Sequence, residues 1–187
     1  MTSRLIVTFL MCSSCAVVGQ TSPTAPAEPP DACALLSRLD VQDAAGIPVG
    51  AGVSRLRTAT LTSCSFAGER GGRLAVLVRT APTGDWVSEQ AGRMKRGIRF
   101  GTYREVPGIG DRSFLYDMRG AGGVLCVFGA GYYLQVSLFR LGEESRISAA
   151  LEKLARSALA RLRSCSYRSL NTLVDNGACR TCCGDAI

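Results

Sequence analysis

Histidine is absent from the 187-residue chain, and its absence excludes several kinds of active site at once. An imidazole serves as the base in Ser-His-Asp and Cys-His nucleophile systems, and it is a common zinc ligand. Lysine is scarce too, since Lys95 and Lys153 are the only two, and neither lies in a recognisable catalytic motif. We therefore expect no catalytic residues, no bound metal and no cofactor.

Long hydrophobic runs and basic stripes are also missing. The most apolar stretch, residues 5–19, is shorter than the roughly 20 residues that a membrane-spanning helix needs. The net charge of +7 comes almost entirely from arginine, but the arginines form no stripe with interleaved aromatic residues, so we expect no nucleic-acid partner. A composition that is 47% hydrophobic and 20% charged excludes general disorder and suits one folded domain with appendages.

The first 30 residues have the pattern of an export signal, over 1–19, followed by a tether. Residues 20–30 contain four prolines among Ser, Thr and Ala, which favours an extended linker. Ser13 and Ser14 precede Cys15 as small residues do in a bacterial lipoprotein signal. We therefore expect export to the cell envelope and lipidation of Cys15. The alternative is cleavage near Gly19 and release as a soluble secreted or periplasmic protein.

Residues 164–187 lack apolar periodicity and contain four of the nine cysteines. A zinc knuckle is disfavoured, because adjacent Cys182 and Cys183 seldom both bind one ion and an oxidising envelope favours disulfides. A disulfide-tied tail and a disordered extension remain open. The sequence does not determine the partners of Cys126, Cys165, Cys179, Cys182 and Cys183.

Residues 31–163 are predicted to form one α+β domain, an antiparallel sheet with helices packed on one face in the order α-ββα-βββα. Residues 64–68 and 126–129 have similar sequences, and this weak internal repeat supports the order. The expected helices cover 31–39, 41–45, 85–96 and 147–162, and the expected strands cover 61–66, 73–80, 113–118, 124–128 and 132–139.

Three details of the helices are specific enough to check. Asp31 is expected to cap the first helix, and Leu39 is expected on its buried side. In the last helix, Glu152 and Arg156 have the i,i+4 spacing of an ion pair on the polar side. The buried stripe of that helix is predicted to contain Ile147, Ala150, Leu151, Leu154, Ala158, Leu159 and Leu162.

Several short motifs occur together along the domain. They are Asp31-Ala-Cys33-Ala-Leu-Leu36, Ala44-Ala-Gly-Ile-Pro48, Cys64-Ser-Phe66, Val106-Pro-Gly-Ile-Gly-Asp111 and an Ala/Leu-rich closing helix over 152–162. In this combination the chain resembles a family of small secreted bacterial lipoproteins known only as a domain of unknown function. The resemblance implies an α+β envelope domain with a disulfide between Cys33 and Cys64. It implies no reaction.

The densest basic run contains Arg93, Lys95, Arg96, Arg99 and Arg104. Basic residues in the last turn of a helix complement its dipole, so a solvated face explains the run without a partner. The alternative is contact with anionic lipid headgroups, because a domain tethered near a membrane would be attracted to them.

Two other features have competing interpretations. The glycine-rich residues 107–111 could cradle an anion, but such loops normally lead into a helix, and here a strand follows. We therefore predict a plain turn. Aromatic residues could line a ligand cleft, although core or sheet-surface positions are the simpler expectation; they are Trp86, Phe100, Tyr103, Tyr132 and Tyr133.

These observations together predict a non-enzymatic binding or interaction module of the cell envelope, whose partner is an unidentified envelope protein or ligand. An envelope hydrolase with a His-free site is the alternative, and a structural spacer is a third option. A convergent acid/base cluster in a deep cleft would favour the hydrolase. A shallow surface with a basic or apolar patch would favour the binding module.

Overall fold

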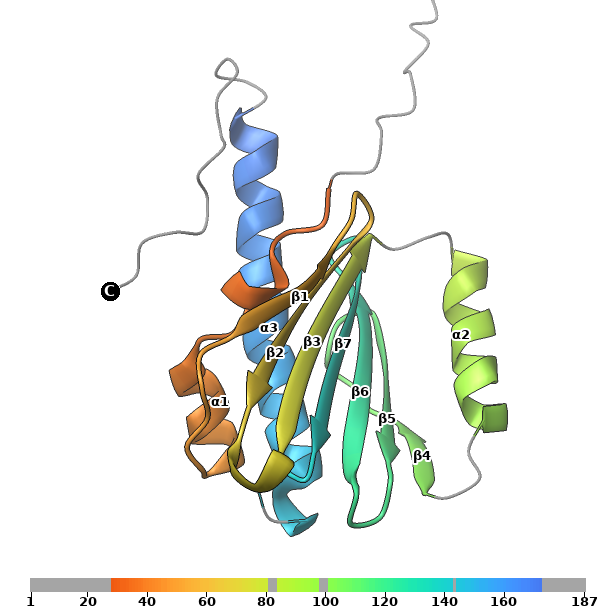
Figure 1. Ribbon diagram of the computed structural model, residues 1–187. Helices are drawn as coiled ribbons and strands as arrows, with labels where there is room; N and C mark the ends of the chain where they lie inside the picture. The colour runs from red at the N-terminus through yellow and green to blue at the C-terminus, as the bar shows by residue number, and fades with distance from the viewer. Residues whose placement is uncertain (1–27, 81–83, 98–100, 143, 173–187) are drawn as a thin grey trace, which may run out of the picture.

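The computed structural model describes residues 28–80, 84–97, 101–142 and 144–172. Seven strands form one antiparallel sheet in the order β1-β2-β3-β7-β6-β5-β4, and three α-helices pack against it (Figure 1). The predicted α+β class and antiparallel sheet are confirmed.

The predicted order of elements is present, with one additional short strand in each half. These two strands, β1 and β4, lie at the edges of the sheet. The strands are β1 (Val53–Arg57), β2 (Leu61–Ala67), β3 (Arg73–Thr80), β4 (Thr102–Glu105), β5 (Arg112–Asp117), β6 (Gly122–Gly129) and β7 (Tyr132–Phe139). The helices are α1 (Arg38–Ala45), α2 (Gly84–Gly97) and α3 (Ile147–Thr172), with short 3-10 turns η1 (Ala32–Ala34), η2 (Glu69–Gly71) and η3 (Glu144–Arg146).

The first helical segment is divided in two. Asp31 caps only the short η1, where its carboxylate accepts a hydrogen bond from the Cys33 N–H at 2.9 Å. Helix α1 then starts after Ser37, which forms a capping box with Asp40: each side chain accepts a hydrogen bond from the backbone N–H of the other. Gly46 ends α1 in the left-handed conformation that favours glycine.

This division corrects the prediction for Leu39, which is 67% exposed rather than buried. Because the new helix starts at Arg38, Val41 and Ala45 form its buried side, and Leu39 points away from it.

One face of the sheet, here called the α3 face, carries α1 and α3 over an almost wholly aliphatic core. Alternate residues of the central strands point into it, because side chains of a strand alternate between the two faces. The predicted stripe of α3 is confirmed, since all seven of its residues are buried. The central-strand members of this core include Leu74, Val76, Val78, Leu125, Val127, Leu134, Val136 and Leu138.

The predicted ion pair between Glu152 and Arg156 is wrong. The Glu152 carboxylate instead accepts a hydrogen bond from Arg104 of β4 at 2.8 Å, and Arg156 donates to the Gly108 carbonyl at 2.7 Å. The fold brings β4 and the loop before β5 beside the polar side of α3. The i,i+4 spacing within α3 cannot reveal partners that come from other elements of the fold.

Helix α2 covers the opposite face, here called the α2 face, whereas one helical face was expected (Figure 1). Large side chains of β5, β6 and β7 point to this face and require a cover. The core beneath α2 is built around Phe114, Cys126, Phe128 and Tyr133, with Trp86, Val87, Ala91, Met94, Tyr103, Leu77 and Val124 around them.

The weak internal repeat is not a structural repeat. Cys64 of β2 lies opposite Val76 and belongs to the core of the α3 face, whereas Cys126 of β6 belongs to the core of the α2 face. The two similar segments therefore present their cysteines to opposite sides of the sheet.

Cys33 and Cys64 are joined by a disulfide, the pairing that the family resemblance implies. The Thr62 hydroxyl also donates a hydrogen bond to the Pro30 carbonyl at 2.6 Å. Together these bonds attach the start of the domain to β2. At the other end, α3 continues past residue 163 to Thr172.

The predictions for Cys15 and for the cysteines at 179, 182 and 183 lie outside the described residues. Within those residues, no helix is both long enough and apolar enough to cross a membrane.

Candidate functional site

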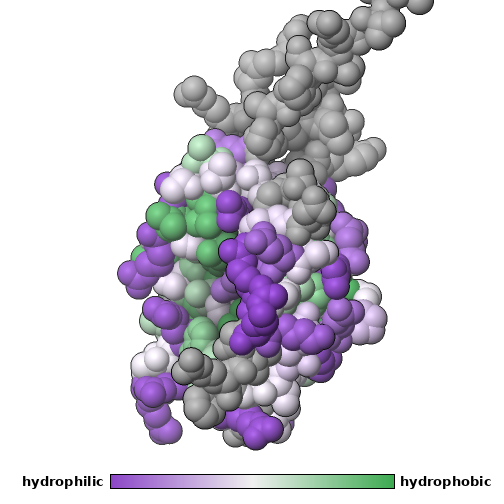
Figure 2. Space-filling view, turned by 90° about the vertical axis from the view of Figure 1, so that its right-hand side faces the viewer, coloured by the Kyte–Doolittle hydropathy of each residue, from purple (hydrophilic) through white to green (hydrophobic). Residues whose placement is uncertain are grey.

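The α2 face is only partly covered, because α2 packs over β5–β7 and leaves the β1–β3 side accessible. Val53 and Leu56 of the edge strand are each 49% exposed there, and Leu61 and Leu77 are half-buried. Figure 2 shows hydrophobic surface beside the hydrophilic band formed by α2. We call this region the open sheet face; it consists of Val53, Arg55, Leu56, Leu61, Arg73, Leu77 and Arg79.

A groove of about 230 Å³ lies where the open sheet face meets α2. The Arg79 guanidinium lies 5.2 Å from the centre of the Trp86 ring, a cation–π distance. Trp86 in turn packs edge-on against Tyr133, with ring centres 5.2 Å apart. The lining is Leu61, Leu77, Arg79, Trp86, Gln90, Arg93, Tyr133 and Gln135.

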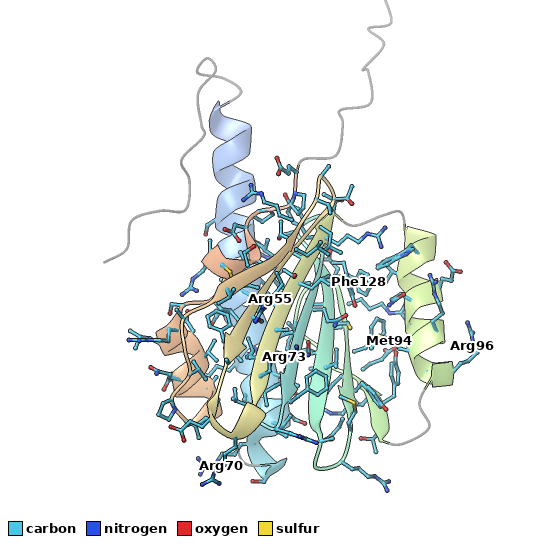
Figure 3. All side chains as sticks on the ribbon, viewed as in Figure 1. Arg55, Arg70, Arg73, Met94, Arg96 and Phe128 are labelled. Atoms are coloured by element: carbon cyan, nitrogen blue, oxygen red, sulfur yellow. A yellow bond between two sulfur atoms is a disulfide. The ribbon has the colours of Figure 1, made fainter. Side chains whose placement is uncertain are left out.

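The open sheet face is cationic as well as apolar. Strands β1, β2 and β3 contain no Asp or Glu, so their only charged side chains are arginines. Arg55 crosses the face and donates a hydrogen bond to the Ser65 hydroxyl at 2.7 Å, and Figure 3 shows Arg55 and Arg73 on the same side of the sheet. Such a surface suits a partner with acidic and apolar groups.

The predicted basic run does not form one continuous surface. Arg93 pairs with Glu89 on α2 at 3.4 Å, and Lys95 lies 5.9 Å from the centre of the Tyr103 ring. Arg96 lies near the end of α2 (Figure 3).

Arg104, on β4, pairs with Glu152 of α3 on the opposite side of the sheet. Arg99 lies outside the described residues. The headgroup hypothesis therefore reduces to Arg93, Lys95 and Arg96, which stand on one helix.

A buried polar network lies beneath α2, centred on the Cys126 thiol. Its sulfur lies 3.1 Å from the Tyr133 hydroxyl and 3.6 Å from the Met94 sulfur, and Tyr133 donates to Gln135 at 2.8 Å. Burial raises the pKa of Cys126 to about 11, and burial together with Cys126 raises the pKa of Tyr133. Both groups are therefore protonated at neutral pH, so Cys126 is not an activated nucleophile.

The predicted aromatic residues divide between core and groove. Trp86, Tyr103 and Tyr133 belong to the core of the α2 face, as expected, and Tyr132 packs against the core of the α3 face. Trp86 and Tyr133 also line the groove, so these two side chains belong to both the core and the groove wall. Phe100 lies outside the described residues.

The glycine-rich residues 107–111 form the predicted turn between β4 and β5. Ile109 is buried, and the Asp111 N–H donates a hydrogen bond to the Phe128 carbonyl at 2.7 Å. This N–H is thus engaged within the fold rather than offered to an anion.

The accessible strand β1 was missed at the sequence level, where residues 50–60 have no predicted element. The signal was present, because Val53 and Leu56 are apolar among polar neighbours in a five-residue strand. A β-bulge between Ser54 and Leu56 breaks the strict alternation and obscures the pattern.

Among the described residues, no three side chains of the types His, Cys, Asp and Glu gather as a metal site. A comparison with protein-family models and with curated proteins finds no match for the chain. The described residues present a sheet face with exposed apolar side chains and an adjoining groove.

Proposed function

We propose that the protein is an exported, non-enzymatic binding module of the cell envelope, and that the open sheet face is its binding surface. The observation that carries this proposal is the exposure of Val53 and Leu56 beside the groove lined by Trp86. Exposed apolar side chains next to a partly filled groove are typical of interaction surfaces.

The proposed partner is an envelope protein with a surface of acidic and apolar side chains. The apolar residues would supply affinity through burial, while Arg55, Arg73 and Arg79 would select for acidic groups. The β-bulge in β1 disfavours simple addition of a partner strand to this edge, so contact with the face is favoured over extension of the sheet.

Two observations support export. The disulfide between Cys33 and Cys64 suits an oxidising compartment, and the first 19 residues have the pattern of an export signal. Lipidation at Cys15 would hold the domain at a membrane.

The binding proposal can be tested in intact cells with a benzophenone amino acid in place of Leu56. Leu39 is a matched control position, because among the described residues it is also a strongly exposed leucine and it lies on α1, on the opposite side of the sheet. We expect ultraviolet light to give a discrete protein adduct from position 56 and none from position 39. The crosslinked partner peptide should contain Asp or Glu beside apolar residues. Equal adducts from both positions, or none from position 56, would contradict the proposal.

The anchor is tested separately by Cys15→Ala and cell fractionation. We expect the unmodified protein to incorporate labelled palmitate and sediment with membranes, and the variant to do neither. Identical distribution of the two proteins without palmitate labelling would refute the lipid anchor and leave the binding surface unaffected.

A further inference from the structure

A second cavity, of about 410 Å³, lies at the end of the molecule opposite residue 28, where α1 ends and α3 begins (Figure 1). Three separate segments form it: the end of α1 with the residues after it, the β2–β3 turn, and the connection from β7 to α3. The lining is Ala45, Gly46, Ile47, Pro48, Glu69, Arg70, Arg140, Gly142 and Arg146. Three arginines and one glutamate thus surround a single cavity.

Close backbone contacts hold the three segments together. A Cβ atom at Gly72 would lie 2.5 Å from the Arg140 carbonyl oxygen, and one at Gly142 would lie 2.7 Å from the Ala45 carbonyl oxygen. Only glycine allows the segments to approach this closely. Leu141, between two of the lining residues, is buried in the core. The backbone frame of the cavity is therefore formed without a ligand.

Two of the arginines have no described side chain as a polar partner. No ion pair or hydrogen bond engages the guanidinium of Arg70 or Arg140 among the residues that the structure describes. Both also adopt the left-handed conformation, with φ of 54° and 49°, which is unfavourable for a residue other than glycine. Figure 3 shows Arg70 at the tip of the β2–β3 turn, near the start of α3.

We propose that this cavity binds a small ligand bearing a phosphate monoester. Guanidinium groups bind phosphate oxygens through paired N–H donors, and their planar geometry suits this anion better than an ammonium does. The guanidinium groups of Arg70 and Arg140 carry two positive charges, which match the two negative charges of a phosphate dianion better than the single charge of a carboxylate. The N-terminal end of α3 adds favourable dipole potential. The volume lies within the range of small-molecule sites.

This site is separate from the open sheet face, so it goes beyond the function proposed above. It also lies at the end of the domain away from residue 28, the side on which an N-terminal anchor would attach. We therefore favour a soluble phosphate monoester as the ligand, rather than a lipid headgroup of the anchoring membrane.

The test is a calorimetric titration of the purified protein with glycerol 3-phosphate at constant ionic strength. We expect a dissociation constant near or below about 1 mM and about tenfold weaker binding by Arg140→Gln. Arg119→Gln is the matched control, because Arg119 is also an exposed arginine with positive φ, 38°, but does not line the cavity. It should leave the affinity unchanged, and Glu69→Gln should strengthen binding by removing a negative charge from the lining.

A parallel titration with vesicles of phosphatidic acid in phosphatidylcholine distinguishes the sources of the phosphate. Binding of glycerol 3-phosphate that depends on Arg140 supports the site and a free ligand. Binding of the vesicles alone, again dependent on Arg140, supports the site with a lipid phosphate as its ligand. No binding of either probe, or equal weakening by Arg140→Gln and Arg119→Gln, would overturn the proposal.

Discussion

The two faces of the sheet carry different kinds of side chain. The α3 face is aliphatic, is covered by two helices and is attached to the chain start through the disulfide of Cys64. The α2 face is aromatic, contains a thiol–phenol network and is covered by one helix. Both faces contain a buried core, but the α2 face also leaves the β1–β3 part of the sheet exposed, so one side of a sheet can contribute stability and still present open surface.

Strand β3 shows this division within eight residues. Leu74, Val76 and Val78 are fully buried on the α3 face, whereas Arg73 is exposed and Leu77 half-buried on the other. Because alternate residues of a strand point to opposite faces, one segment supplies both the core and the open surface.

The largest expected effect is the loss of the disulfide on the α3 face. The loop between Cys33 and Cys64 spans 31 positions, and its closure stabilises the domain by about 3 to 4 kcal/mol on the chain-entropy model. We expect the double substitution of both cysteines by alanine to lower the melting temperature by about 10 °C. Thermal unfolding with and without reductant measures this. A reductant that shifts the double variant as much as the unmodified protein would show that another bond is responsible.

The next effect compares matched leucines on the two faces. Leu134 of β7 is buried in the α3 face, and Leu77 of β3 is half-buried in the groove of the α2 face. Leu134→Ala should cost about 3 kcal/mol, because it leaves a cavity in a closed core, and Leu77→Ala about 1 kcal/mol. Denaturant unfolding of both variants gives the two values. Equal losses would mean that the faces contribute equally to stability.

The smallest effect concerns Asp40, whose carboxylate accepts hydrogen bonds from Arg161 of α3 and from Ser37. Burial acts to raise its pKa, but these hydrogen bonds outweigh burial and lower the pKa below its usual 3.8. A lowered folded-state pKa stabilises the protein above the unfolded pKa, and this stabilisation is lost as the pH falls through the folded value.

We therefore expect Asp40→Asn to cost about 1 kcal/mol above about pH 5, with the difference from the unmodified protein disappearing in stronger acid. Asp43→Asn is the control on the same helix, because Asp43 is largely exposed and forms an exposed ion pair with Lys153, and it should change stability by less than about 0.5 kcal/mol. Unfolding curves across a pH series test both. A difference for Asp40→Asn that persists unchanged in acid would refute this role of the carboxylate.

Elements with strong local patterns were predictable from the sequence. The bounds of β3 and β7 agree with the structure, because apolar alternation ends at clear turns, and the stripe of α3 is continuous over four turns. The disulfide followed from the family resemblance, since spacing alone does not select Cys64 among the cysteines.

The features that the sequence did not predict depend on contacts between segments that lie far apart in the chain. The face that α2 covers follows from side chains of β5–β7, which come later in the chain. The cavity arginines Arg70 and Arg140 lie far apart in sequence, and both stand in turns without a pattern of their own. The edge strand β1 was also hard to recognise, because its β-bulge interrupts the alternation of apolar and polar residues and all five of its residues are exposed.

The α3 face is expected to stabilise the domain, and the open sheet face is expected to bind the partner. This division of roles is tested most directly by the yield of the photo-adduct from position 56 in two variants, Leu134→Ala and Val53→Asp. Val53 is half exposed, so its substitution should leave the fold intact, and the melting temperature of each variant verifies this. We expect Leu134→Ala to lower the melting temperature and keep the adduct yield per folded molecule, and Val53→Asp to keep the melting temperature and abolish the adduct. If Val53→Asp leaves the adduct unchanged, or Leu134→Ala removes it from molecules that remain folded, the division of roles between the faces is contradicted.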